Sequence, residues 1–419
     1  MEAAMGRTLI EKIIGAHGEG DCKAGNVVWM DIDNRSARDF AGANVVGNLE
    51  RYGGDKPIDD PEKTFFTFDC NVPANTIPYA TNQHRIRLFA GKHNLKVFDV
   101  NAGIGSHVVI EEGLARPGAT TVGTDSHLNI MGATGGFGQG MGDVDIAFAF
   151  KTGKVWFQVP ESVKVNLIGM PAGGTEAKDV ALAMLREFGS HDLLGKSVEV
   201  AGDWVDQASL SDCITLSSLA TEMGAIIILI APNQTVLDHF GMNREEAVYP
   251  DDDADYEKEY TLDITGLKPL LAAPPNPHNV HPVSDCTHIE VDGVFIGSCT
   301  NGTYEDLAYA AGLLKGRKVA EGVMLKVVPA TRKTWDKLLH QGLLADLFDA
   351  GAIVSNAGCG GCASGQIGMT GEKEVQVSTS NRNFTGKQGR GDTYLAGIGT
   401  AVASAVLGRI AGVQELEEV

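Results

Sequence analysis

Short apolar runs alternate with segments of helical periodicity along this chain, and this alternation constrains the fold more than any other feature. The expected strands lie at 27–31, 64–69 and 96–100, and a helix is expected at 79–93. Strands separated by helices form βαβ units, so the pattern predicts an α/β protein with largely parallel sheets. In such sheets the residues that contact ligands gather where strands end. Asp69 and the Thr-Asp-Ser-His stretch at 124–127 lie at such positions.

The length of 419 residues exceeds that of one typical core and predicts more than one domain. We expect one α/β domain over residues 1–159, a second over 160–270 and a third over 283–419. Between the last two, residues 271–282 read L-A-A-P-P-N-P-H-N-V-H-P. Proline at this density is typical of a linker, so this segment is the predicted boundary.

The composition narrows the choice of partners and compartment. A formal net charge of −20 argues against nucleic acid as a general partner, and it means that an anionic substrate needs locally gathered arginine and lysine. The seven cysteines are an odd number without a regular framework, which favours a reducing compartment. No stretch approaches the roughly 20 apolar residues that span a bilayer, and the N-terminus has no apolar signal core. We therefore expect a cytoplasmic protein without membrane contact.

Three cysteines carry the strongest chemical signal. Cys299 lies in G-S-C-T-N-G, and Cys359 and Cys362 form a C-x-x-C pair in N-A-G-C-G-G-C-A-S-G. Three thiolates suit an iron–sulfur cubane held at three corners, whose open fourth iron acts as a Lewis acid toward a hydroxyl or carboxylate. A structural zinc site and three unrelated buried thiols are the alternatives that the spacing leaves open.

Two further stretches carry groups suited to an anionic substrate. Asp125 and His127 are two residues apart after an expected strand, so both side chains can face one site and share proton transfer. Near the C-terminus, Arg382 can hold a carboxylate through two parallel hydrogen bonds, with Lys387 as a point charge. Taken alone, the first stretch is more often structural hydrogen bonding, and the second can be an ordinary polar loop.

Four motifs in this order resemble those of the aconitase family. They are G-T-D-S-H at 123–127, G-S-C-T-N at 297–301, C-x-x-C at 359–362 and S-N-R-N-F-x-G at 380–386. The C-terminal run T-Y-L-A-G-I-G-T-A-V-A-S-A-V-L-G-R-I looks most like the large subunits of 3-isopropylmalate dehydratases and homoaconitases within that family. The resemblance covers nearly the whole chain.

The resemblance implies a fold, a cofactor and a partner. The implied fold is a three-domain α/β/α core around an iron–sulfur cluster, without the swivelling domain of full-length aconitases. The cluster would be [4Fe-4S], held by Cys299, Cys359 and Cys362, with the open iron binding the substrate hydroxyl. A separate small subunit would supply the swivelling domain and complete the active site.

The resemblance also implies roles for individual residues. Asp125 and His127 match family active-site residues, and Glu222 matches a carboxylate that orients the histidine. Asn381 and Arg382 match residues that contact cluster and substrate. The residues that we expect to contact the substrate are Ser126, Asn381, Arg382 and Lys387.

The chain departs from the family pattern where protons are handled. The family reads Asp-His where this chain has Asp69 and Cys70, and Ser106 stands on a second family histidine, with His107 displaced by one residue. On a strand such a shift turns the side chain to the other face. Lys387 replaces an arginine and keeps only its charge. We hypothesise that Cys70, Ser106 or His107 takes over part of the proton relay, because a thiol with a pKa near 8.5 can donate a proton.

These features together predict the cluster-binding, catalytic large subunit of a hydro-lyase. The expected reaction is dehydration or isomerisation of a small anionic hydroxy acid, such as 3-isopropylmalate or a related 2-alkylmalate. Two alternatives remain at this point. One is a non-catalytic iron–sulfur sensor or degenerate paralogue of the family, and the other is a zinc-stabilised binding module.

Overall fold

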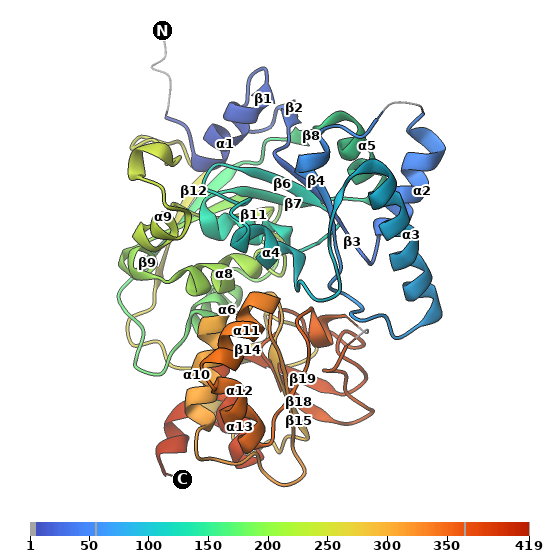
Figure 1. The fold of residues 1–419 in the computed structure, drawn as a ribbon. Helices are drawn as coiled ribbons and strands as arrows, with labels where there is room; N and C mark the ends of the chain where they lie inside the picture. The colour runs from blue at the N-terminus through green and yellow to red at the C-terminus, as the bar shows by residue number, and fades with distance from the viewer. Residues whose placement is uncertain (1–5, 55–56, 364–365, 419) are drawn as a thin grey trace.

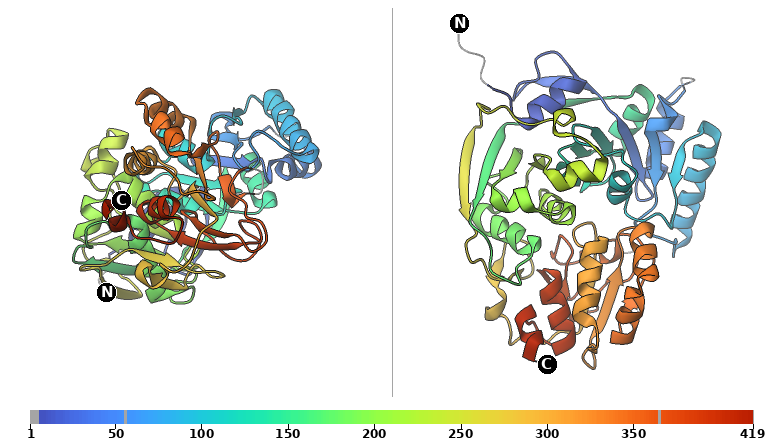
Figure 2. Two further views of the ribbon diagram at one scale, coloured as in Figure 1. Left: turned by 90° about the horizontal axis from the view of Figure 1, so that it is seen from below. Right: turned by 60° about the vertical axis from the view of Figure 1, so that its left-hand side comes forward.

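The structure is a computed structural model that describes residues 6–54, 57–363 and 366–418. Three larger β-sheets carry helices on their faces, and a small antiparallel sheet lies near the N-terminus. Figure 1 shows the first two large sheets, blue to green, above the C-terminal sheet in orange and red, and the right-hand view of Figure 2 keeps this separation. Within the described residues, no helix is both long and apolar enough to cross a membrane. The predicted α/β class is confirmed.

The first large sheet is parallel throughout, in the order β5-β4-β3-β6-β7. Its strands are β3 (Asn34–Arg38), β4 (Thr64–Thr67), β5 (Lys96–Phe98), β6 (Thr120–Gly123) and β7 (Phe137–Gly140). The helices between and after them are α2 (Gly42–Tyr52), α3 (Ile77–His93), α4 (Gly105–Glu111) and α5 (Asp143–Thr152). The strands predicted at 64–69 and 96–100 and the helix predicted at 79–93 are therefore confirmed, with each strand ending two residues early.

A three-stranded antiparallel sheet precedes and edges this layer. It contains β1 (Gly18–Glu19), β2 (Val27–Asp31) and β8 (Lys154–Gln158), after a first helix, α1 (Leu9–His17). The strand predicted at 27–31 forms, but its place in a βαβ unit was wrong. Two residues separate β2 from β3, and a parallel crossover needs a dozen or more.

The second large sheet is also parallel, in the order β11-β10-β9-β12. Its strands are β9 (Ser162–Ile168), β10 (Ser197–Ala201), β11 (Ile227–Ile230) and β12 (Lys258–Asp263). Its helices are α6 (Ala177–Phe188), α7 (Asp203–Gln207), α8 (Leu210–Ser218) and α9 (Gln234–Phe240). A buried 3-10 turn at Leu128–Thr134 packs against α8 and β11, and so joins the first sheet to the second.

The third sheet is mixed, in the order β14-β13-β19-β18-β15-β16-β17. The antiparallel edge is β13 (Leu270–Ala272) and β14 (Val280–Pro282). The parallel strands are β15 (Gly293–Gly297), β16 (Met324–Val328), β17 (Ile353–Val354), β18 (Val375–Ser378) and β19 (Asp392–Ala396). The helices are α10 (Tyr304–Leu314), α11 (Arg332–His340), α12 (Leu343–Ala350) and α13 (Ile398–Leu407). Every residue of β15 is buried, as expected for a central strand with both faces covered.

The proline-rich segment at 271–282 contributes to this third sheet. It carries most of β13 and all of β14, and Leu271 is fully buried. The first parallel sheet lies within residues 1–159 and the second within 160–270. The domain boundaries themselves stay a prediction.

The parallel strands of the first and third sheets direct their carboxyl ends at the same place. Arg38 closes β3, Asp69 and Asp125 follow β4 and β6, Cys299 follows β15, and Arg382 follows β18. Side chains from these loops line one cavity. The fold therefore places the polar residues of two sheets around a shared site, as open α/β sheets do at their carboxyl edges.

Candidate metal centre and active site

A cavity of about 460 Å³ lies at this meeting point. Its lining contains the thiols of Cys70, Cys299, Cys359 and Cys362 and the cationic side chains of Arg38, Arg382 and Lys387. A larger cavity of about 990 Å³ lies beside β8 and is lined by apolar side chains such as Trp29 and Phe148. We place the functional site in the smaller cavity, because that is where titratable and ligating groups converge.

The three predicted ligand cysteines come from two loops of the third sheet. Cys299 follows β15, whereas Cys359 precedes the 3-10 turn Gly360–Cys362 after β17 and Cys362 ends that turn. Cys299 and Cys359 are buried, and Cys362 is partly exposed. Burial raises the pKa of the Cys299 thiol well above its ordinary value, and the neighbouring thiols of Cys362 and Cys359 raise it further. The three sulfurs are therefore electrostatic neighbours, and a bound cation would favour all three thiolates.

The spacing of the sulfurs bears on the kind of metal group that they could hold. A tetrahedral zinc ion, with Zn–S near 2.3 Å, holds its sulfurs roughly 3.8 Å apart. Within the described part of the chain, one group of three ligating atoms lies within 4.8 Å of one another, and it consists of Asp69, Cys70 and Cys359 rather than the three cysteines. The sulfurs of Cys299, Cys359 and Cys362 do not all lie within this distance of one another, although all three residues line the same cavity.

Arg38 links the first sheet to the cysteine loop, and we call its contacts the Arg38 network. Its Nε donates to Asp69 Oδ1 at 2.8 Å, its Nη1 to Asp125 Oδ1 at 2.8 Å, and its Nη2 to Cys359 Sγ at 2.6 Å. The register explains the contacts: Ser36 pairs with Gly123, so Arg38 is level with Asp125, which lies two residues beyond the end of β6. The guanidinium is a permanent cation, so the network neutralises a buried carboxylate pair.

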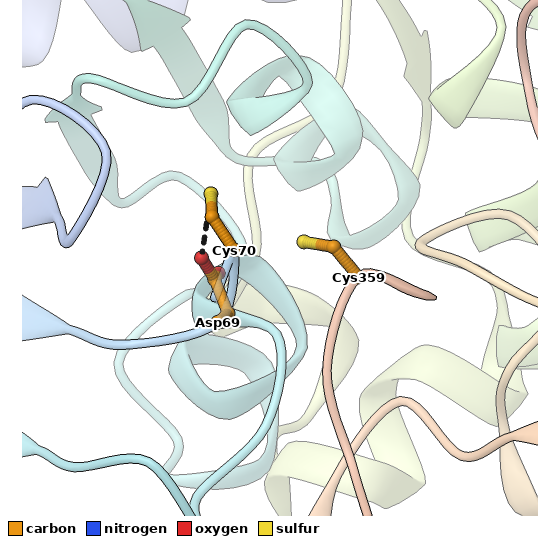
Figure 3. A group of neighbouring side chains, drawn as sticks. All are labelled: Asp69, Cys70 and Cys359. Atoms are coloured by element: carbon orange, nitrogen blue, oxygen red, sulfur yellow. Dashed lines mark hydrogen bonds between the residues drawn. The ribbon is translucent and has the colours of Figure 1, made fainter. Parts of the chain in front are cut away.

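Cys70 belongs to the same network through Asp69. Its thiol donates to Asp69 Oδ1 at 3.4 Å, and Figure 3 shows the Cys359 side chain pointing from its own loop toward Cys70. A hydrogen bond to Cys359 and burial raise the pKa of the Cys70 thiol well above its ordinary value. Burial also raises the pKa of Asp69, to about 6, although Arg38 lowers it in part. Cys70 is thus a protonated thiol at neutral pH.

Asp39 fixes the loop that carries Asp69 and Cys70. Its carboxylate accepts the backbone N–H groups of Asp69, Cys70 and Asn71 at 3.0 to 3.2 Å. The Cys359 N–H in turn donates to the Asp69 carbonyl at 2.9 Å. These bonds hold the two loops together before any metal is bound, so the placement of Cys70 beside Cys359 is built into the backbone.

A second set of contacts, the Glu222 network, surrounds the predicted imidazole. Glu222 Oε1 lies 3.0 Å from His127 Nε2 and accepts from Arg382 Nε at 2.7 Å. Burial raises the pKa of Glu222, but the charges and hydrogen bonds of His127 and Arg382 outweigh it, and the pKa is lower than usual. Glu222 Oε2 is buried and has no partner among the described residues. The structure thus brings together His127, Glu222 and Arg382.

Asp125 connects the two networks. Its Oδ1 accepts from Arg38 and also from the His127 backbone N–H, at 3.0 Å. Burial raises the pKa of Asp125, but Arg38 and His127 outweigh burial and lower the pKa overall. Ser126 is placed with its Oγ 3.4 Å from His127 Nδ1. The carboxylate of Asp125 is therefore ionised and fixed between the cysteine loop and the imidazole.

The Asn381–Arg382 loop is held from behind by a buried lysine. Lys178 Nζ donates to the carbonyls of Thr379 and Ser380, at 3.2 and 2.8 Å. Asn381 Oδ1 lies 3.4 Å from Cys299 Sγ, and its amide donates to the Ser218 carbonyl at 2.9 Å. Burial lowers the pKa of Lys178 to about 8. The loop that presents Arg382 is therefore anchored on both sides.

The structure separates Ser106 from His107, and one expectation about them was wrong. Both lie in the helix α4, so the strand argument for opposite faces does not apply, because the sequence after Gly105 begins a helix. His107 Nε2 bonds the Cys299 carbonyl at 2.8 Å, and the ring lines a different cavity, beside Tyr304. Ser106 Oγ is buried with no partner among the described residues. Neither side chain lines the thiol cavity, whereas Cys70 does.

Sequence reasoning missed Arg38 and Lys178. Arg38 lies in the polar stretch N-R-S-A-R-D, which has no strand-like alternation, and Lys178 lies in a helix whose first turn also holds Asp179. The position of Arg38 at the end of a parallel strand was the signal that could have identified it. No pattern in the sequence distinguishes a buried lysine from a solvated one.

Comparison with known proteins agrees with this geometry. The family model described as "Aconitase family (aconitate hydratase)" matches residues 11–288 and 284–408. The chain is 40% identical to "3-isopropylmalate dehydratase large subunit 1" of Methanopyrus kandleri, over 97% of this chain and 98% of the relative. It is also 40% identical to "Homoaconitase large subunit" of Thermus thermophilus, over 99% of both.

A solved structure shares the fold. It is the crystal structure of Thermococcus kodakaraensis aconitase X in its holo-form, with a TM-score of 0.50 and 11% identity over 84% of this chain and 83% of that one. At this identity the likeness concerns the fold alone. The family model and the near-complete relatives decide the assignment: this chain belongs to the aconitase family.

Proposed function

We propose that this chain is the cluster-bearing large subunit of a hydro-lyase that acts on a hydroxylated dicarboxylate, such as 3-isopropylmalate or a related 2-alkylmalate. Relatives about 40% identical over their whole length are named as large subunits of 3-isopropylmalate dehydratase and homoaconitase, and this supports the reaction class. The observation that carries the proposal is the convergence of four thiols, three cations and the His127 imidazole, which is paired with Glu222, on one cavity.

Cys299, Cys359 and Cys362 would hold a [4Fe-4S] cluster. Two observations support this assignment over a zinc ion: the three residues line one cavity, and their sulfurs do not all lie within 4.8 Å of one another. When bound, the cluster supplies a Lewis acid that polarises the hydroxyl group to be removed.

The carboxylates of the substrate need cations in a chain of net charge −20. Arg382 and Lys387 line the cavity and are the proposed carboxylate contacts, with Ser126 and Asn381 beside them. The Nε of Arg382 is bound to Glu222, which fixes the plane of the guanidinium. The terminal nitrogens of that side chain are then directed by the protein rather than by the substrate, which lowers the cost of ordering it.

His127 is the proposed centre of proton transfer. Glu222 fixes the ring through Nε2, so Nδ1 is the nitrogen left near Ser126. Cys70 is the proposed proton donor on the other side of the cavity. It lines the cavity and is protonated, whereas Ser106 and His107 lie outside it.

A separate small subunit is proposed to complete the cavity, because the relatives are named as large subunits. A cytoplasmic location is also proposed, because all seven cysteines are free thiols, as is usual in a reducing compartment.

The test is turnover by the two-subunit complex. The chain is purified anaerobically with its small subunit, loaded with iron and sulfide, and supplied with 2- and 3-isopropylmalate and with 2-alkylmalates of different chain length. We expect one of these acids to be dehydrated, with formation of the unsaturated acid read by its absorbance, and neither subunit alone to show turnover. A complex that holds a complete cluster and dehydrates none of them would support the sensor alternative instead.

A further inference from the structure

Arg38 makes a contact that the proposed reaction does not use. Its Nη2 donates to Cys359 Sγ, while its Nε and Nη1 are held by Asp69 and Asp125. The two carboxylates come from the ends of two other strands, so the guanidinium is fixed in plane by the first sheet. Its remaining nitrogen is thereby directed at a sulfur that belongs to the third sheet.

The neighbouring arginine on the same strand provides a natural comparison. Arg35 is more deeply buried than Arg38, with its side chain 2% exposed against 14%, but it lies three residues earlier in β3, an odd separation that turns its side chain to the opposite face. It pairs with Asp59 at 2.8 Å and does not reach the thiol cavity. Burial of an arginine in this strand therefore does not by itself require a cysteine.

The contact distinguishes Cys359 from the other two proposed ligands. Cys299 Sγ lies beside the neutral amide of Asn381, and Lys387 acts on Cys362 by charge. Across the described residues, no other arginine or lysine donates a hydrogen bond to one of these three sulfurs. The sulfur of Cys359 alone thus receives a charge-assisted hydrogen bond.

We infer that Arg38 is a positioning residue for the metal centre, which holds the Cys359 thiolate in place and makes the cluster harder to oxidise. The inference rests on the proposed [4Fe-4S] cluster. A hydrogen bond from a cation withdraws electron density from a ligand sulfur and favours the more reduced state, since hydrogen bonds to the sulfurs and local charge set the potentials of such clusters. In a hydro-lyase this protects the fourth iron, which oxidation releases.

The experiment compares Arg38→Met, Arg38→Lys and the control Arg35→Met in the anaerobic cluster-loaded complex. The oxidation midpoint of the cluster is read by EPR, and the rate of iron loss is followed after a fixed dose of ferricyanide. We expect Arg38→Met to lower the midpoint and to lose iron about tenfold faster, the factor that roughly one charged hydrogen bond carries. Arg38→Lys, which keeps the charge but not the three-way fork, should fall between this variant and the original protein.

The control variant and the possible negative results distinguish the inference about Arg38 from the proposed function. Arg35→Met should match the original protein in midpoint and iron loss, even if its melting temperature falls. If Arg38→Met assembles a cluster with unchanged midpoint and unchanged iron loss, the inference about Arg38 is overturned and the proposed function stands. If Arg38→Met assembles no cluster, the midpoint and the rate of iron loss are measured on Arg38→Lys instead. Values equal to those of the original protein would then overturn the inference about Arg38. An original protein with no iron–sulfur signal would instead overturn the proposed function.

Discussion

The Glu222 network and the Arg38 network line the same cavity but bury their charges in opposite ways. In the first, one carboxylate is shared by a titratable imidazole and a guanidinium. In the second, one guanidinium is shared by two carboxylates and a thiol sulfur. The first network therefore has a carboxylate at its centre, whereas the second has a permanent cation there.

This difference assigns separate tasks to the two networks. The Glu222 network has the pairing of base and orienting carboxylate that proton transfer requires. The Arg38 network lacks an imidazole side chain and places Cys70 beside a proposed ligand cysteine, so we assign its main effect to the proposed metal centre. Cys70, one of the departures from the family pattern, lies in the second network, and His127, Glu222 and Arg382, which match the family, lie in the first. The predictions that follow test this division.

The largest effect should come from removing a ligand that the Arg38 network holds. Replacing Cys359→Ala leaves two of three proposed ligand thiolates, so we expect the cluster to be lost and turnover to become undetectable. Iron and acid-labile sulfide per chain are the measurement. Cys286→Ala is the matched control, because this thiol lies outside the cavity and should leave both contents unchanged. Full iron and sulfide in Cys359→Ala would contradict the assignment.

A large loss of turnover without loss of cluster should follow from Glu222→Gln. The amide keeps the shape of the side chain but not the charge that orients His127, so we expect the turnover number to fall about 10²-fold or more. Iron content should match that of the original protein, because Glu222 touches no proposed ligand. A parallel fall of iron content and turnover would instead mean that the two networks are one functional unit.

A smaller loss is expected for Cys70→Ala, and it tests whether the Arg38 network also moves protons. If this thiol donates a proton, turnover should fall roughly 10- to 100-fold, at the low end of general acid catalysis. Ser106→Ala serves as the comparison, since that hydroxyl lies outside the cavity and should change turnover little. Full turnover in Cys70→Ala would remove the proton-donor role from Cys70.

The smallest effect concerns stability, and its sign should differ between the two networks. The pKa of Glu222 is lowered by folding, so its contribution to the melting temperature is present above about pH 4.3 and is lost as the pH falls through the folded-state pKa. Asp69 has a pKa raised to about 6, so its contribution is present below about pH 3.9 and is lost as the pH rises to about 6.

Melting temperatures of the metal-free protein from pH 3.5 to 7 measure this contrast. The difference between the original protein and Glu222→Gln should grow in favour of the original protein as the pH rises from the acid end. The difference between the original protein and Asp69→Asn should move against the original protein between about pH 4 and 6. Equal slopes for the two variants would show that the networks do not differ in charge as described.

Much of the fold could be predicted because its signal is local. The apolar runs at 64–69 and 96–100 became strands, and the periodic segment at 79–93 became α3, since burial of one face decides each element. The strand at 27–31 formed, but its partner strand β8 lies more than a hundred residues away in the sequence. A local pattern cannot predict which strand pairs with it at that distance. Residues 271–282 joined a sheet for the same reason, because β13 pairs with β19 near the C-terminus.

In the candidate site, too, the residues with a local sequence signal could be predicted and those positioned by distant contacts could not. The three cysteines and the Asp125–His127 pair carry motifs, so sequence reasoning found them. Arg38 belongs to no motif. Its contacts depend on the strand register, which sets it level with Asp125, and on a cysteine loop more than three hundred residues away in the sequence. Ser106 and His107 were placed on a strand because glycines obscure the start of α4. Contacts between distant segments were therefore the part that the sequence left open.

The central claim is that the cavity holds a cluster with one iron free of cysteine, and EPR after mild oxidation tests it most directly. The protein is purified anaerobically, and iron, sulfide and zinc are assayed on the same sample. We predict a three-iron signal that disappears when ferrous iron and reductant are added, because three thiolates retain three irons and the fourth is labile. A protein that contains zinc and no sulfide would contradict the account and favour a structural metal site.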